Sequence, residues 1–169
     1  MTDANGTGIR TVELREGALL SVVTGNLERL IRAAVHIPGV THFAAVGGPD
    51  LRKWFHPVAR TREVPSLQVP EIPRTGAPRR TVVACSVDFV AKESVARFLL
   101  KASNKPSWPG AVLWHWWLYS DDVLLFGAYD WPQVVRVDQS LAQWEQPLLD
   151  DGTLRRWIPA RHEGHLPPT

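Results

Sequence analysis

The stretch from Ala111 to Val137 constrains the fold more than any other part of the chain. Its sequence, AVLWHWWLYSDDVLLFGAYDWPQVVRV, contains two apolar runs separated by Ser-Asp-Asp and carries four of the eight tryptophans. Runs rich in Trp, Tyr, Val and Leu on either side of such a turn predict the two strands of a β-hairpin.

In the first of these runs, apolar side chains occupy both sets of alternating positions. Strict alternation along a strand places one set on each face, the first being Val112, Trp114, Trp116 and Leu118 and the second being Leu113, His115, Trp117 and Tyr119. Both faces therefore need cover from helices or from a second sheet. We expect this hairpin at the centre of a sheet.

Other segments carry periodicities of their own. Apolar residues recur every three or four positions near 24–35, 92–103 and 140–149, which predicts amphipathic helices, and a shorter helix is expected between Asp50 and Phe55. Strands are expected at 40–46 and 81–91, whereas 11–23 fits either a strand or a helix. The prediction is an α+β fold, with an antiparallel or mixed β-sheet and a Trp-rich central hairpin, covered by about three helices.

Composition places this fold in one domain. The chain has 169 residues, 44% of them hydrophobic, and a net charge of +2, which fits a single core. We expect a flexible N-terminal tail at 1–10, the domain at 11–158 and a C-terminal tail at 159–169.

The chain ends and the single cysteine predict the compartment. Cys85 alone cannot form an internal disulfide, and its place among strand valines predicts a buried, inert thiol. The start lacks the pattern of a secretory signal, and no apolar stretch approaches the ~20 residues that span a bilayer. We expect a cytoplasmic protein without membrane association.

Residues 57–80 differ from the rest because five prolines exclude regular helix there. The segment carries five arginines against two glutamates, and Trp54 and His56 immediately precede it. Extended, proline-rich chain is suited to docking, and guanidinium groups pair with carboxylates or phosphates; a solvated loop packed on the sheet is the alternative. The candidate binding residues are Trp54, His56, Arg60, Arg62, Arg74, Arg79 and Arg80.

Other polar groups have structural interpretations that we favour over catalysis. Asp88 is expected to cap the following helix, His115 to be a core imidazole, and the Asp121-Asp122 pair to form the hairpin turn. The Gly47-Gly48-Pro49 run predicts a tight turn rather than a phosphate loop. The cluster of His162, Glu163 and His165 lacks the spacing of a zinc site. No catalytic residue, metal or cofactor is predicted.

Three functions remain open on these grounds. The first is a non-catalytic interaction protein of regulatory, adaptor or immunity type that binds an acidic partner protein through the Arg/Pro-rich segment. The second is a nucleic-acid-associated protein, which the low net charge disfavours. The third is an enzyme or small-ligand binder with a Trp-lined pocket around Asp88 and His115.

Overall fold

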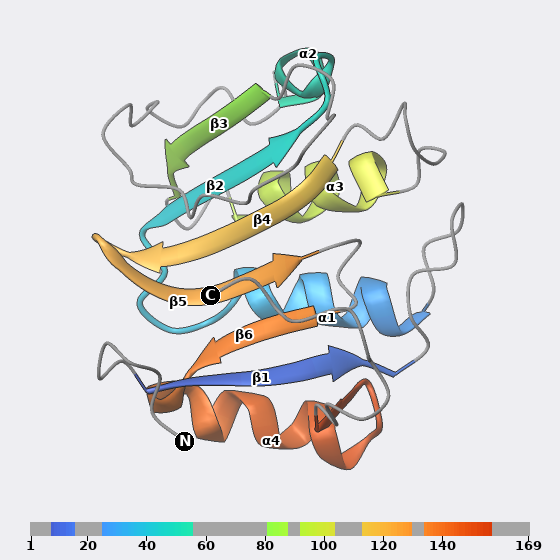
Figure 1. The fold of residues 1–169 in the computed structure, drawn as a ribbon, viewed down its shortest axis with the longest axis vertical. Coiled ribbons are helices and arrows are strands. Elements are labelled where there is room, and N and C mark those ends of the chain that lie inside the picture. Colours follow the sequence, from blue (N-terminus) through green and yellow to red (C-terminus); the bar gives the residue numbers. More distant parts are fainter. Residues whose placement is uncertain are drawn as a thin grey trace, which may run out of the picture.

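A seven-stranded antiparallel sheet with helices packed against it forms the core of the protein (Figure 1). The computed structural model describes residues 8–15, 25–55, 81–87, 92–103, 113–129 and 134–156. The strands are β1 (Ile9–Leu14), β2 (His42–Gly47), β3 (Thr81–Ser86), β4 (Leu113–Ser120), β5 (Val123–Tyr129), β6 (Val134–Asp138) and β7 (Leu154–Arg156), in the order β3-β2-β4-β5-β6-β1-β7. All pairings are antiparallel, which decides between the two expected sheet types.

The helices are α1 (Gly25–Val35), α2 (Leu51–Phe55), α3 (Lys92–Ser103) and α4 (Ala142–Asp150), the last preceded by a short 3₁₀ turn at Gln139–Leu141. Helices α1 and α3 lie behind the sheet in Figure 1, and α4 lies beside its β1 end. The three longer helices match the segments predicted from periodicity, and the α+β class is confirmed. At α4 the Asp138 carboxylate accepts a hydrogen bond from the Ser140 N–H at 2.8 Å and so caps the entering turn.

The helix-covered face holds the larger hydrophobic cluster. Its strand residues include Phe43, Val83, Trp116, Phe126 and Val135, all buried. The ring centroids of Trp116 and Phe126 are 4.9 Å apart, and those of Phe126 and Trp144 on α4 are 5.7 Å apart. Burial against α1, α3 and α4 is therefore what holds the sheet and the helices together.

A β-bulge changes which face of the sheet two residues of β4 occupy. Val46 pairs with His115, but the next residue, Gly47, pairs with Leu113, so Trp114 is an extra residue in the ladder. As a result Leu113 joins Trp116 in the helix-covered cluster, whereas Trp114 joins Trp117 and Tyr119 in a second cluster. The predicted alternation is therefore wrong for Leu113 and Trp114 and correct for Trp116 to Tyr119. The extra residue at the bulge moves the side chains that precede it to the opposite faces of the sheet.

Three other differences concern strand boundaries. The second apolar run contains two strands, β5 and β6, rather than one. Strand β1 begins at Ile9, inside the stretch expected to be a tail, and residues 11–14 adopt the strand alternative. The three-residue strand β7 had no counterpart in the prediction, because so short a segment carries no periodic signal.

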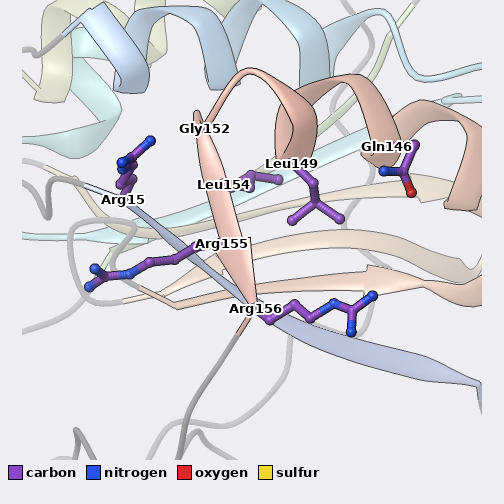
Figure 2. Close-up of a pocket in the computed structure, with 7 residues that line it drawn as sticks. All are labelled: Arg15, Gln146, Leu149, Gly152, Leu154, Arg155 and Arg156. Atoms are coloured by element: carbon purple, nitrogen blue, oxygen red, sulfur yellow. The ribbon is translucent and has the colours of Figure 1, made fainter.

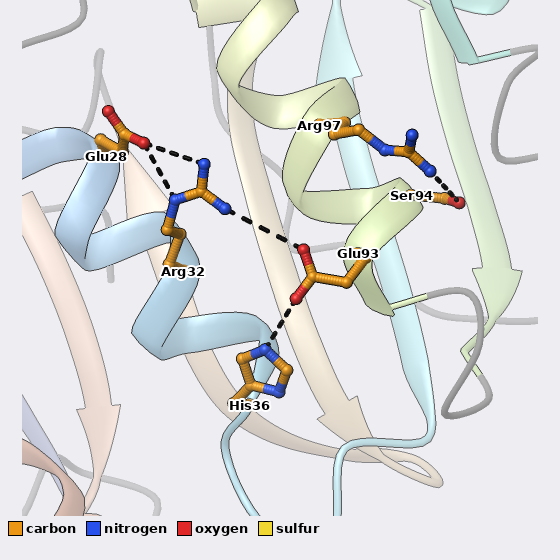
Figure 3. A network of polar contacts seen from close by, with 6 residues as sticks. All are labelled: Glu28, Arg32, His36, Glu93, Ser94 and Arg97. Carbon is orange, nitrogen blue, oxygen red and sulfur yellow. Dashed lines mark hydrogen bonds and ion pairs between the residues drawn. The ribbon is translucent and has the colours of Figure 1, made fainter.

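Exposed ion pairs join α1 to α3 (Figure 3). The Arg32 guanidinium contacts the Glu28 carboxylate at 2.9 Å and the Glu93 carboxylate at 4.0 Å, and Nε2 of His36 lies 3.0 Å from Oε1 of Glu93. Surface pairs of this kind contribute about 0 to 1 kcal/mol each. They orient the two helices, while buried residues such as Leu30 and Leu99 supply the main stabilisation.

We expect Trp116→Ala to lower the free energy of unfolding by about 3 to 5 kcal/mol, because truncation of a large buried aromatic leaves a cavity. Chemical denaturation followed by far-UV circular dichroism measures this loss. Val123→Ala is the matched control, since Val123 is 55% exposed on the neighbouring strand, and it should cost no more than about 0.5 kcal/mol. A similar small loss for Trp116→Ala would contradict the assignment of this face as core.

Candidate functional site

The edge of the sheet formed by β1 and β7 combines buried and exposed charge. Glu13 on β1 lies directly opposite Arg155 on β7, and their side chains form an ion pair. Glu13 is only 2% exposed, so its ion pair with Arg155 offsets part of the cost of burying the carboxylate. On the other face of β1, Arg10 forms an ion pair with buried Glu145 of α4. These two pairs anchor the edge to the sheet and to the helix layer.

The turn from α4 into β7 is held by a network of short hydrogen bonds. The Asp151 carboxylate accepts hydrogen bonds from the Thr153 hydroxyl at 2.6 Å and from the Thr153 N–H at 2.8 Å, and it pairs with Arg29. The Thr153 hydroxyl bond, together with the Thr153 N–H and Arg29, lowers the pKa of Asp151 below its usual value. Gly152 adopts φ +77, a conformation that glycine tolerates best and that commonly ends a helix.

A cavity of about 360 Å³ lies along this edge (Figure 2). Three of its lining residues are arginines, and the described lining residues are Arg15, Gln146, Leu149, Gly152, Leu154, Arg155 and Arg156. Figure 2 shows Arg155 and Arg156 extending to opposite sides of β7, with Arg15 near Gly152. The volume falls in the lower part of the range of ligand pockets.

Two of these arginines differ from the third in their ion pairing. Arg155 is neutralised by Glu13, whereas the structure gives Arg15 and Arg156 no ion pair among the described residues. The described residues of the lining include no carboxylate. A planar guanidinium donates two parallel hydrogen bonds to a carboxylate or a phosphate. The pocket is therefore complementary to an anion.

Part of the positive charge of the pocket arginines has a structural explanation, because these residues lie near the C-terminal end of α4. A helix C-terminus carries a partial charge of roughly −0.5, and Arg15 lies against Gly152, just past that end. Arg15 and Arg156, which form no ion pair with another described residue, together carry about four times that charge with opposite sign. The end of α4 therefore offsets only part of their charge.

The lining also limits the chemistry of this pocket. Within the part of the chain that the structure describes, it contains no thiol, hydroxyl, imidazole or carboxylate side chain that could act as a nucleophile or a general base. Arginine stays protonated at physiological pH and serves in recognition rather than in proton transfer. The arrangement supports binding of an anionic group.

Most residues predicted to bind a partner fall outside the described ranges. These are His56, Arg60, Arg62, Arg74, Arg79 and Arg80. Trp54 is described, and it is half-buried on α2, packed at the margin of the main core. Nζ of Lys101 lies 4.9 Å from the centre of its ring, a distance typical of a cation–π contact. Trp54 thus has a packing role in addition to the predicted binding role.

The residues of the alternative Trp-lined pocket are only partly described. Asp88 lies outside the described ranges, as do His162, Glu163 and His165. His115 is 1% exposed, with its ring centre 6.2 Å from that of Trp117 and 5.8 Å from that of Tyr129. These surroundings agree with the prediction of a core imidazole. No group of three or more potential metal ligands occurs among the described residues.

The hairpin aspartates form the predicted turn. Asp121 adopts φ 52 between β4 and β5, and its N–H donates to the Thr41 hydroxyl oxygen at 2.6 Å. Aspartate tolerates this left-handed conformation better than most residues. This hydrogen bond links the hairpin turn to the residue just before β2. Neither aspartate is among the described residues that line the arginine pocket.

The pocket arginines were missed because no local pattern connects them. Arg155-Arg156 is visible as a basic dipeptide after Asp151-Gly152, but Arg15 is 140 positions away in the sequence. Only the antiparallel pairing of β1 with β7 brings Arg15 opposite Thr153, whose carbonyl oxygen accepts the Arg15 N–H at 3.2 Å. The dipeptide was the one available signal.

Comparisons with protein-family models, with curated proteins and with solved structures each gave no match. Within the described ranges, no helix has the length and apolar character needed to cross a membrane.

Both tyrosines of the chain lie on the face of the sheet with the second cluster. Burial raises the pKa of Tyr119 well above the ordinary value, and the charge that Tyr129 would carry raises it further. Burial also raises the pKa of Tyr129, although a polar contact with Trp117 and the charge of Arg136 oppose this. Gly127 makes this packing possible, since a Cβ there would lie 2.9 Å from both aromatic side chains, Trp117 and Tyr129.

We expect neither tyrosine to ionise near pH 10 while the protein is folded. In the unfolded chain both titrate near a pKa of about 10, so above that pH the unfolded state loses protons that the native state keeps. The contribution of the two tyrosines to the free energy of unfolding is then fully present below pH 10 and is lost as the pH rises above 10. Phenolate absorbance measured alongside circular dichroism tests this, and ionisation of either tyrosine near pH 10 without loss of structure would contradict it.

Proposed function

We propose that the protein is a small cytoplasmic, non-catalytic interaction protein, of regulatory, adaptor or immunity type, that binds an acidic partner protein. The observation that carries the proposal is the pocket at the sheet edge, where Arg15 and Arg156 have no ion pair among the described residues and no carboxylate lines the cavity. Such a pocket is suited to carboxylate side chains of a partner. The Arg/Pro-rich segment at 57–80 enters the proposal as a second contact region.

Electrostatic complementarity explains how these features would act together. Arginines on an interface accelerate encounter with an acidic surface and select against basic ones. Arginine is also enriched among the residues that dominate binding energy at protein interfaces. The leucines at positions 149 and 154 add apolar lining beside the charges, which fits the mixed character of interface centres.

Phosphate could occupy the same guanidinium groups, so the nucleic-acid function is retained as the second candidate. Binding to nucleic acid is dominated by counterion release and is largely independent of sequence. A protein partner would be recognised with shape as well as charge. A single-stranded oligonucleotide of random sequence therefore serves as the competing ligand in the tests.

The double variant Arg15→Glu, Arg156→Glu should lose the acidic partner that the wild-type protein retains from its native cytoplasm. Each charge-assisted pair is worth about tenfold in affinity, so the combined loss is on the order of 100-fold. The control Lys53→Glu, Arg97→Glu makes the same change in net charge at exposed positions on α2 and α3. Equal retention by the arginine-pocket variant and the wild type, with melting temperatures unchanged, would contradict the proposal.

Reversal of Arg74, Arg79 and Arg80 to Glu tests the second contact region. We expect the variant to lose partner binding with an unchanged far-UV spectrum and melting temperature, and association of the wild-type protein to slow as salt rises, because charge at an interface mainly tunes encounter. Titration against the retained partner and against the oligonucleotide separates the two functions. Salt-sensitive oligonucleotide binding that is lost in the variant would instead favour the nucleic-acid function.

A further inference from the structure

Two carboxylates at the C-terminal end of α4 lie beside the arginine pocket in the sequence, yet neither is among its described lining residues. Asp150 accepts a hydrogen bond from Nε2 of Gln146 at 2.6 Å. Asp151 accepts two hydrogen bonds from Thr153 at its Oδ1 atom and forms an ion pair with Arg29 through its Oδ2 atom. Both oxygens of Asp151 are therefore occupied by groups that do not belong to the pocket arginines.

The Arg15 guanidinium lies within reach of the Asp151 carboxylate. A Cβ atom at Gly152 would overlap the Arg15 guanidinium, so this group lies directly against the Gly152 backbone. Consecutive Cα atoms are about 3.8 Å apart, which places Asp151 one residue from this contact. Among the described residues, no ion pair joins Arg15 to Asp151 or to any other group. An Asp151 carboxylate released from its present contacts would be attracted to this guanidinium.

Arg29 reaches Asp151 from α1, across the gap between two helices of the same layer. The side chains of Arg29 and Asp151 are 59% and 29% exposed, and ion pairs of this kind contribute little to stability. The contact has a second consequence that does not depend on stability. Because it engages a carboxylate beside the pocket, it determines whether that carboxylate competes with a ligand for Arg15.

From this arrangement we infer that Arg29 is a positioning residue of the arginine pocket. It binds the Asp151 carboxylate, with Thr153 on the other oxygen, and so keeps Asp151 from neutralising Arg15. Carboxylates of the acidic partner then pair with Arg15 without competition from the chain's own aspartate. The inference rests on the proposed function and identifies a residue outside the described lining that sets the affinity of the pocket.

A labelled acidic peptide measures that affinity without knowledge of the partner. The probe is fluorescein-labelled hexaglutamate, and fluorescence anisotropy at low ionic strength gives its dissociation constant. Arg29→Gln should bind the probe about tenfold more weakly than the wild-type protein does, which is the loss expected for one charge-assisted pair. Its melting temperature should be nearly unchanged. Equal affinities, or no binding of the probe by the wild-type protein, would overturn the inference.

A matched variant on the same helix controls for the change in net charge. Arg32 is 52% exposed and pairs with Glu28, and Arg32→Gln removes one positive charge from α1, as Arg29→Gln does. This variant should bind the probe within about twofold of the wild-type affinity, because salt screens exposed charges that do not contact the ligand. A tenfold loss here as well would show a general charge effect and would overturn the inference.

Neutralisation of the competing carboxylate should restore binding. In the double variant Arg29→Gln, Asp151→Asn the amide oxygen can still accept the hydrogen bonds from Thr153, but the side chain carries no charge. The affinity for the probe should return to about the wild-type value, whereas Asp151→Asn alone should change it by no more than about twofold, because Arg29 already engages this carboxylate. A double variant as weak as Arg29→Gln would overturn the inference.

The Arg15→Gln background provides the last test, because it removes the group for which Asp151 competes. The double variant Arg15→Gln, Arg29→Gln should bind the probe as tightly as Arg15→Gln alone, since the effect of Arg29 acts through Arg15. A further tenfold loss in the double variant would overturn the inference. The proposed function would still stand in that case if the Arg15→Glu, Arg156→Glu variant fails to retain the acidic partner.

Discussion

Burial of both faces of β4 is the constraint on which the rest of the structure depends. Trp116 faces the helix layer and Trp117 faces the second cluster, and each is almost completely enclosed. A strand of this kind must lie inside a sheet, so β2 and β5 pair on either side of it. The β-bulge at Trp114 then places Leu113 and Trp116 on the helix-covered face and Trp114 on the face with the second cluster.

Strand β1 connects the arginine pocket beside β7 to the rest of the sheet. β1 lies between β6 and β7, and its register sets Glu13 opposite Arg155 and Arg10 beside Glu145. In each pair the carboxylate is buried and the guanidinium is part-exposed, so the pair adds little net stability, but a slipped register would separate the buried carboxylate from this arginine. Correct register in turn places Arg15 at the turn that ends α4, where it completes the pocket.

Part of the fold could be predicted because its signals are local. Helices α1, α3 and α4 followed from apolar spacing, since neighbours three or four residues apart share a helix face. The turn at Asp121 followed from aspartate's own conformational tolerance. The face occupied by Trp114 could not be predicted, because the bulge arises from pairing with β2, a strand more than 60 positions earlier. Nor could β7, whose three residues form a strand only because β1 offers them a partner.

The sequence by itself determined the α+β class and the positions of the longer helices. These depend on periodicity and on the need to remove large apolar side chains from water. Only the tertiary structure decided that the sheet is wholly antiparallel, that β7 lies at one end of the described strand order, and that Arg15 and Arg156 line the same pocket. These depend on strand pairing between segments far apart in the chain, where contact is set by the register of the whole sheet rather than by neighbouring residues.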